Sequence, residues 1–199
     1  MSNHSDFEPQ EFIKFSQVEN DSLKVFHLNI RSFSSNILQF DHLLRLISHK
    51  IDIIILSEAW INNVETYKSF FQDYEMYFSG KINRAGGVIV LTYRENIKVH
   101  DFQVNCINES DSVVLNISYK NLKFQTIVAL YRPPSTNFNR FIDSLIKNLD
   151  AHKNRVYLMA GDFNVDMKKY NTDAKSENLC DTLSEHGLMP VIQTRGVRS

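Results

Sequence analysis

The segment Ile51–Leu56, with the sequence IDIIIL, limits most strongly how this chain can fold. Five of its six residues are apolar, and Asp52 alone interrupts the run. A strand of this kind is covered on both faces and lies in the middle of a sheet. Polar residues follow at once, so the predicted strand ends beside Glu58. The chain therefore needs further layers of secondary structure on both faces of a central sheet.

Segments with strand or helix character flank this run. Residues 24–30 (KVFHLNI) alternate as a strand does, and apolar residues from Ile37 to Ile47 recur at helical spacing behind Ser34 and Ser35, two candidate helix caps. Four later segments are rich in Val, Ile, Phe and Tyr and predict an antiparallel meander: 86–93, 97–105, 112–120 and 122–134.

The last third of the sequence returns to alternating helices and strands. An amphipathic helix is predicted over 138–149, a buried strand over 155–164, and a third helix that ends at Gly187. Strands in two groups with helices between them favour two packed sheets with helices outside. The predicted fold is a four-layer α/β/β/α sandwich of two mixed sheets.

Length and composition suit one domain. Residues 1–22 are polar and predict an N-terminal tail, which leaves 23–199 for the domain. A net charge of -1 means that any nucleic acid must be bound by local patches. Neither a secretion signal nor a membrane-spanning run occurs, and the two cysteines lack the spacing of a zinc site. These features predict an intracellular chain without a membrane partner.

Polar residues follow three of the predicted strands. Asn29 comes after KVFHL, Glu58 after IDIIILS, and Asp162 and Asn164 after RVYLMAG. Each of them alone fits a residue that caps a turn or a helix. Together, carboxylate and amide oxygens at converging strand ends favour a site for a hard divalent cation such as Mg²⁺.

Five blocks of the sequence resemble the endonuclease/exonuclease/phosphatase superfamily, in the same order: HLNIRSF, LSEAW, GGVIVLTYR, ALYRPPS and AGDFNVD. The blocks YRPP and SEAW are most similar to the endonuclease domains of non-LTR (LINE-like) retrotransposons. The resemblance covers about residues 23–195. It implies Mg²⁺ as cofactor with Mn²⁺ as an alternative, double-stranded DNA as partner, a nuclear location, and a parent protein that also carries a reverse transcriptase.

The resemblance also implies a role for each site residue. Glu58 would coordinate the metal, and Asn29 would support the metal and the scissile phosphate. Asp162 would orient or deprotonate the attacking water, Asn164 would hold the phosphate or the same water, and the hydroxyl of Tyr131 would approach the phosphate.

Four residues near these blocks each have two alternative roles. Three arginines follow strand ends and are candidate phosphate contacts, with simple solvation as the alternative: Arg31, Arg132 and Arg195. For Trp60 we expect a place in the core beside the site, with base stacking as the alternative.

The family pattern is interrupted near the C-terminal end of the sequence. The superfamily ends with an acidic residue in a late strand and a Ser-Asp-His block, and neither occurs here. We therefore expect a domain that lacks its last strands and has impaired activity. Three functions stay open: DNA nicking, hydrolysis of a small or lipid phosphate ester, and non-catalytic binding of nucleic acid.

Overall fold

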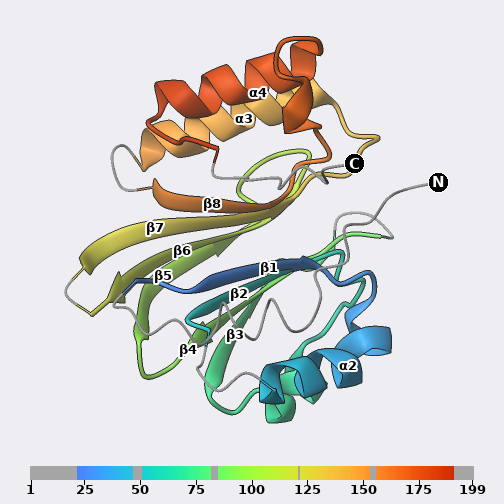
Figure 1. Ribbon diagram of the computed structural model, residues 1–199, viewed down its shortest axis with the longest axis vertical. Coiled ribbons are helices and arrows are strands. Elements are labelled where there is room, and N and C mark those ends of the chain that lie inside the picture. Colours follow the sequence, from blue (N-terminus) through green and yellow to red (C-terminus); the bar gives the residue numbers. More distant parts are fainter. Residues whose placement is uncertain (1–21, 47–50, 82–84, 121, 153–155, 191–199) are drawn as a thin grey trace, which may run out of the picture.

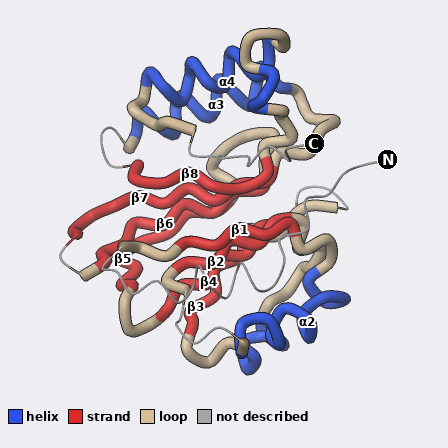
Figure 2. Tube along the Cα trace, viewed as in Figure 1, coloured by secondary structure: helices blue, strands red, loops and turns tan. Residues whose placement is uncertain are grey.

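Two four-stranded sheets pack face to face, with helices on both outer sides (Figures 1 and 2). The computed structural model describes residues 22–46, 51–81, 85–120, 122–152 and 156–190. The first sheet has the order β1 (Val25–Asn29), β2 (Ile53–Ser57), β4 (Val88–Tyr93) and β3 (Tyr74–Phe78). The second has the order β5 (Ile97–Val104), β6 (Asp111–Tyr119), β7 (Leu122–Tyr131) and β8 (Val156–Asp162). The pairs β1–β2 and β7–β8 are parallel and the other pairs antiparallel, so both sheets are mixed.

Helices form the two outer layers. Helix α2 (Phe33–Arg45) lies below the first sheet in Figure 1, and helices α3 (Phe138–Ala151) and α4 (Ala174–Glu185) lie above the second. Two 3-10 helices, η1 (Glu65–Phe70) and η2 (Met167–Lys169), lie in the connections. This arrangement confirms the predicted α/β/β/α sandwich. None of the helices in the described part of the chain has the length and apolar character that crossing a membrane requires.

Strand β2 shows how the sequence builds these layers. Ile53 and Ile55 pack into the core between the two sheets, whereas Ile54 and Leu56 pack into the core under α2. Successive side chains of a strand point to opposite faces, so a strand with four consecutive apolar residues serves two cores. All five residues of β2 are buried, which confirms its predicted central position.

The start of α2 differs from the prediction. The helix begins at Phe33, and Ser32 occupies the cap position without a side-chain capping bond, in place of Ser34 or Ser35. The backbone of the neighbouring loop supplies the partners instead. The amide of Ser32 donates to the carbonyl of Glu58 (2.9 Å), and the amide of Phe33 donates to the carbonyl of Ala59 (2.8 Å).

Three strand predictions also need correction. Strand β3 was missed, because a five-residue segment that contains Glu75 carries a weak apolar pattern. The segment 86–93 belongs to the first sheet, so only β5, β6 and β7 form the meander. Strand β8 lies at an edge of its sheet among the described residues and is only partly buried. The predicted tail, apart from Ser22, lies outside the described residues, as does Arg195.

Candidate functional site

The predicted site residues meet at one end of the sandwich, between the two sheets. Val25 on β1, Ala129 on β7 and Ala160 on β8 all pack into the inter-sheet core. Because the side-chain period of a strand is two, the inward-facing rows continue through Asn29, Tyr131 and Asp162. The carboxyl ends of two parallel strand pairs thus bring these side chains together.

Asn29 joins the two predicted carboxylates. Its Nδ2 donates to Glu58 Oε1 at 2.7 Å and to Asp162 Oδ2 at 3.1 Å. The second bond crosses from one sheet to the other. The two acceptors set the orientation of the amide, because only its nitrogen can donate to a carboxylate. The amide oxygen, Oδ1, is buried and has no hydrogen-bond partner among the described residues.

This unpartnered oxygen is informative about a ligand. A buried acceptor without a donor costs about 1–3 kcal/mol, so its retention next to two carboxylates requires a reason. Mg²⁺ takes oxygen ligands, one or two of them carboxylates, and keeps several waters. The donor set of Glu58 and Asn29 Oδ1 beside Asp162 fits that ion. The described residues contain no group of three His, Cys, Asp or Glu side chains arranged for a metal.

The loop that carries Glu58 is held by a glycine pair. The amide of Ala59 donates to the carbonyl of Gly87 (3.1 Å), and the amide of Trp60 donates to the carbonyl of Gly86 (2.9 Å). Gly87 has φ 93°, and a Cβ there would lie 3.2 Å from a backbone oxygen. The glycines therefore act as a close-approach position that fixes the loop.

The second site loop is tied to the end of β7. Asp162 Oδ1 accepts from the amide of Asn164 (3.0 Å), and Asn164 Nδ2 donates to the carbonyl of Arg132 (2.8 Å). The guanidinium of Arg132 donates in turn to the carbonyls of Phe163 (2.8 Å) and Asn164 (3.0 Å). The blocks YRPP and GDFN thus form one interlocked unit, in which Asp162 and Asn164 have fixed positions.

Arg132 consequently has a different role from the predicted phosphate contact. It is 2% exposed, and its guanidinium also contacts the carbonyl of Pro133 (3.2 Å) and lies over the rings of Phe138 and Phe141. Burial lowers the pKa of its guanidinium. The guanidinium donates its hydrogen bonds to backbone carbonyls and so stabilises the loop. This structural role replaces the predicted phosphate contact. Arg31, by contrast, is exposed in the loop between β1 and α2.

Tyr131 lies in a negative environment. Burial raises its pKa to about 12, the carboxylates of Glu58, Asp162 and Asp111 act in the same direction, and a hydrogen bond with Asn164 opposes them. The phenol therefore stays protonated at neutral pH and keeps a hydroxyl donor close to the two predicted carboxylates.

Two further residues at this end of the sandwich were missed. Asp111 is fully buried, and its Oδ2 accepts from the amide of Gly87 at 2.8 Å. His27 contacts the hydroxyl of Ser57 at 3.1 Å through Nε2, and burial lowers its pKa while the charge of Asp162 opposes that effect. Their positions in the inward-facing rows of β6 and β1 are the signal that would have found them.

Trp60 is 39% exposed. The prediction of a core position for it was therefore wrong.

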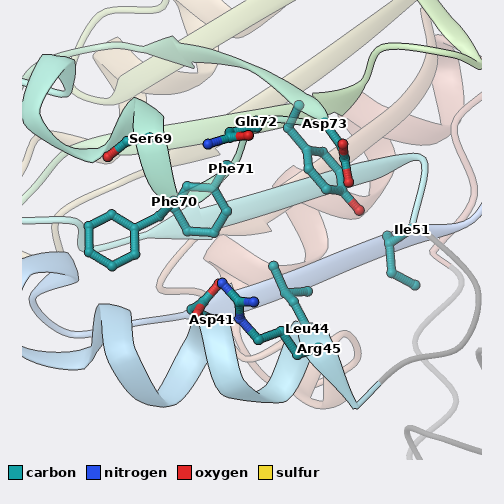
Figure 3. Close-up of a pocket in the computed structure, with 10 residues that line it drawn as sticks. Asp41, Leu44, Arg45, Ile51, Ser69, Phe70, Phe71, Gln72 and Asp73 are labelled. Atoms are coloured by element: carbon teal, nitrogen blue, oxygen red, sulfur yellow. Dashed lines mark hydrogen bonds and ion pairs between the residues drawn. The ribbon is translucent and has the colours of Figure 1, made fainter.

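A separate pocket of about 380 Å³ lies between α2 and the segment from η1 to β3 (Figure 3). It is lined by residues that include Leu44, Phe71 and the ion pair of Asp41 with Arg45. None of the predicted site residues lines it. The carboxylates lie instead at the end of the inter-sheet core.

Residues 125–198 match a protein-family model described as endonuclease-reverse transcriptase. An AP endonuclease from Archaeoglobus fulgidus is similar in structure, with 17% identity and a TM-score of 0.62 over 82% of this chain and 70% of that chain. A 3′ phosphatase, NExo from Neisseria, bound to a product DNA hairpin, has 16% identity and a TM-score of 0.59 over 88% and 80%. The human Nocturnin catalytic domain has 14% identity and a TM-score of 0.56 over 86% and 77%. A comparison with curated protein sequences gives no match.

At such identities the solved structures show a shared fold. The family model matches only the segment 125–198, and this match agrees with the predicted endonuclease/exonuclease/phosphatase resemblance. The closer similarity to retrotransposon endonucleases stays a prediction.

Proposed function

We propose that this chain hydrolyses phosphodiester bonds of double-stranded DNA with the help of Mg²⁺, as the endonuclease part of a retrotransposon-derived protein. The observation that carries the proposal is the pair of hydrogen bonds from Asn29 to Glu58 and Asp162, with the amide oxygen left without a partner among the described residues. Two facts about similar proteins agree with it. The matched family model is described as an endonuclease, and the similar structures of NExo and of D. rerio TDP2 contain DNA product.

Glu58 and Asn29 would hold the metal ion, whose charge stabilises the negative charge that develops on a phosphate under attack. The remaining steps fall to other side chains. Asp162 accepts hydrogen bonds from Asn29 and the Asn164 amide, and its remaining acceptor capacity can orient or deprotonate a water. The hydroxyl of Tyr131 donates a hydrogen bond to the phosphate. Asn164 holds the Asp162 loop and contacts the phosphate or the same water.

The same residues would serve a second enzymatic function. A phosphatase or phosphodiesterase acting on a small or lipid phosphate needs the same carboxylates, and the similar structures include phosphatases. The two functions differ only in substrate. Measurement of phosphate release from a small ester and of plasmid nicking by the same protein therefore distinguishes them.

We also propose that full activity needs the Ser-Asp-His segment of the superfamily, because a histidine positioned at the reacting phosphate commonly contributes about 10²- to 10⁴-fold in rate. Extension of residues 1–199 by this segment should raise the nicking rate.

Replacement of Glu58 by glutamine tests the catalytic proposal. In the extended protein, we expect Glu58→Gln to lower Mg²⁺-dependent nicking of plasmid DNA by about 10²- to 10³-fold, because a carboxylate ligand of the metal ion that stabilises the reacting phosphate is lost. The control is Glu65→Gln, at an exposed carboxylate of η1. Nicking at the parent rate by Glu58→Gln, with unchanged thermal unfolding, would remove Glu58 from the site. Binding of DNA without any nicking by the parent would favour the non-catalytic alternative.

A further inference from the structure

Trp60 is the single tryptophan of the chain, and it stays partly in solvent between two buried neighbours. Ala59 is 0% exposed and Ile61 is 7% exposed, whereas Trp60 is 39% exposed. An indole gains more than most side chains from burial. The exposure of the indole beside a buried core therefore indicates that this side chain contacts a ligand at the surface.

The exposed indole is carried by a fixed backbone. Glu58 and Trp60 have φ values of 55° and 56°, in a region that bulky residues rarely adopt. Such a conformation costs about 1–3 kcal/mol and persists where the surroundings hold it. The backbone amides of Ala59 and Trp60 donate to the carbonyls of Gly87 and Gly86 and hold the loop in this conformation. The indole is thus presented by a rigid loop.

Trp60 also lies close to the proposed cleavage point. One residue, Ala59, lies between Glu58 and Trp60, so their Cα atoms are at most about 7 Å apart. Successive nucleotides of one strand rise by about 3.4 Å in a duplex. A phosphate held at the site beside Glu58 therefore leaves the bases of the adjacent nucleotides within reach of the indole. Arg31, which is exposed, follows β1. The amide of its neighbour Ser32 donates to the carbonyl of Glu58, so Arg31 lies beside the same loop.

We propose that Trp60 stacks on an unpaired nucleobase next to the phosphodiester held at Asn29, Glu58 and Asp162. A base inside a duplex has both faces covered by its neighbours, so stacking on an indole requires a base that is bulged, frayed or turned out. The proposal rests on the proposed function and narrows its substrate class to DNA with an unpaired nucleotide beside the cleavage point.

The single tryptophan makes the test direct, because tryptophan-selective fluorescence of residues 1–199 reports on Trp60 alone. Two dye-labelled duplexes of equal length serve as probes, one fully paired and one with a single bulged adenine. Ca²⁺ replaces Mg²⁺ as an oxygen-binding cation. Binding is measured by anisotropy of the dye and stacking by quenching of Trp60.

The bulged duplex should quench Trp60 and bind about tenfold more tightly than the paired duplex. Trp60→Ala should remove this preference and leave affinity for the paired duplex unchanged. Trp60→Leu is a second variant that keeps apolar volume without an aromatic face, and it should behave in the same way, whereas Trp60→Phe should keep part of the preference. Phe70→Ala is the matched control, since Phe70 is 38% exposed on η1, and it should retain the preference.

The outcomes separate this proposal from the proposed function. Binding of the bulged duplex without quenching, or a preference that survives in Trp60→Leu, would overturn stacking and leave phosphodiester hydrolysis untouched. Absence of binding to both duplexes by the parent protein would overturn the stacking proposal together with the DNA function.

Discussion

Replacement of Arg132 by lysine should destabilise the protein although it keeps the positive charge. The planar guanidinium donates to three backbone carbonyls, those of Pro133, Phe163 and Asn164, at 3.2, 2.8 and 3.0 Å. The ammonium group of lysine lacks this fork of donors. In the 2% exposed position of Arg132 it can serve one of the three carbonyls, which leaves two without a donor.

The cost follows from those two acceptors. Each acceptor left unpaired costs about 1–3 kcal/mol, and part-exposure of the loop lets water replace some of the loss, so we expect about 2–4 kcal/mol in total. For a domain of this size the melting temperature should fall by about 10 °C. Urea unfolding followed by circular dichroism gives the free energy of unfolding.

Arg31→Gln is the matched comparison, since Arg31 is exposed and is still predicted to contact phosphate. It should leave the free energy of unfolding unchanged and lower the salt dependence of DNA binding by about one phosphate contact. Arg132→Lys should show the reverse pattern. Unfolding of Arg132→Lys at the parent urea midpoint, combined with weaker DNA binding, would refute the structural role of Arg132 and restore the phosphate contact.

Three further predictions concern the fold. Gly161→Ala should lower the melting temperature and abolish nicking, because a Cβ there would lie 1.8 Å from the backbone oxygen of Leu130; a melting temperature equal to that of the parent would contradict this. Phe141→Ala should cost about 3–5 kcal/mol in urea unfolding, since Phe141 is fully buried, while Leu38→Ala at an exposed position should be neutral. Asp173→Ala should lower the melting temperature at neutral pH, because Asp173 caps α4 and its hydrogen bonds lower its pKa. That contribution is present above the unfolded pKa and is lost as pH falls through the lowered one, so melting scans of the two proteins should converge at acid pH.

The layers of the fold could be predicted because their causes are local. Four consecutive apolar residues in β2 require two covered faces, and the helical spacing from Phe138 to Leu149 requires one. Strand β3 escaped prediction because its sheet pairing with β4, rather than its own pattern, holds it in place. The position of 86–93 in the first sheet escaped for a related reason, since pairing with β2 is a long-range choice.

The amino-acid sequence by itself determined which polar residues follow the strands, and so singled out Asn29, Glu58 and Asp162. Only the tertiary structure decided that Asn29 reaches both carboxylates, because that contact joins residues 133 positions apart across two packed sheets. The same holds for Arg132 and Trp60, one buried against carbonyls and the other left in solvent. The sequence determines the chemistry of each side chain. Its burial and its hydrogen-bond partners depend on which distant segments pack around it, and no local pattern contains that information.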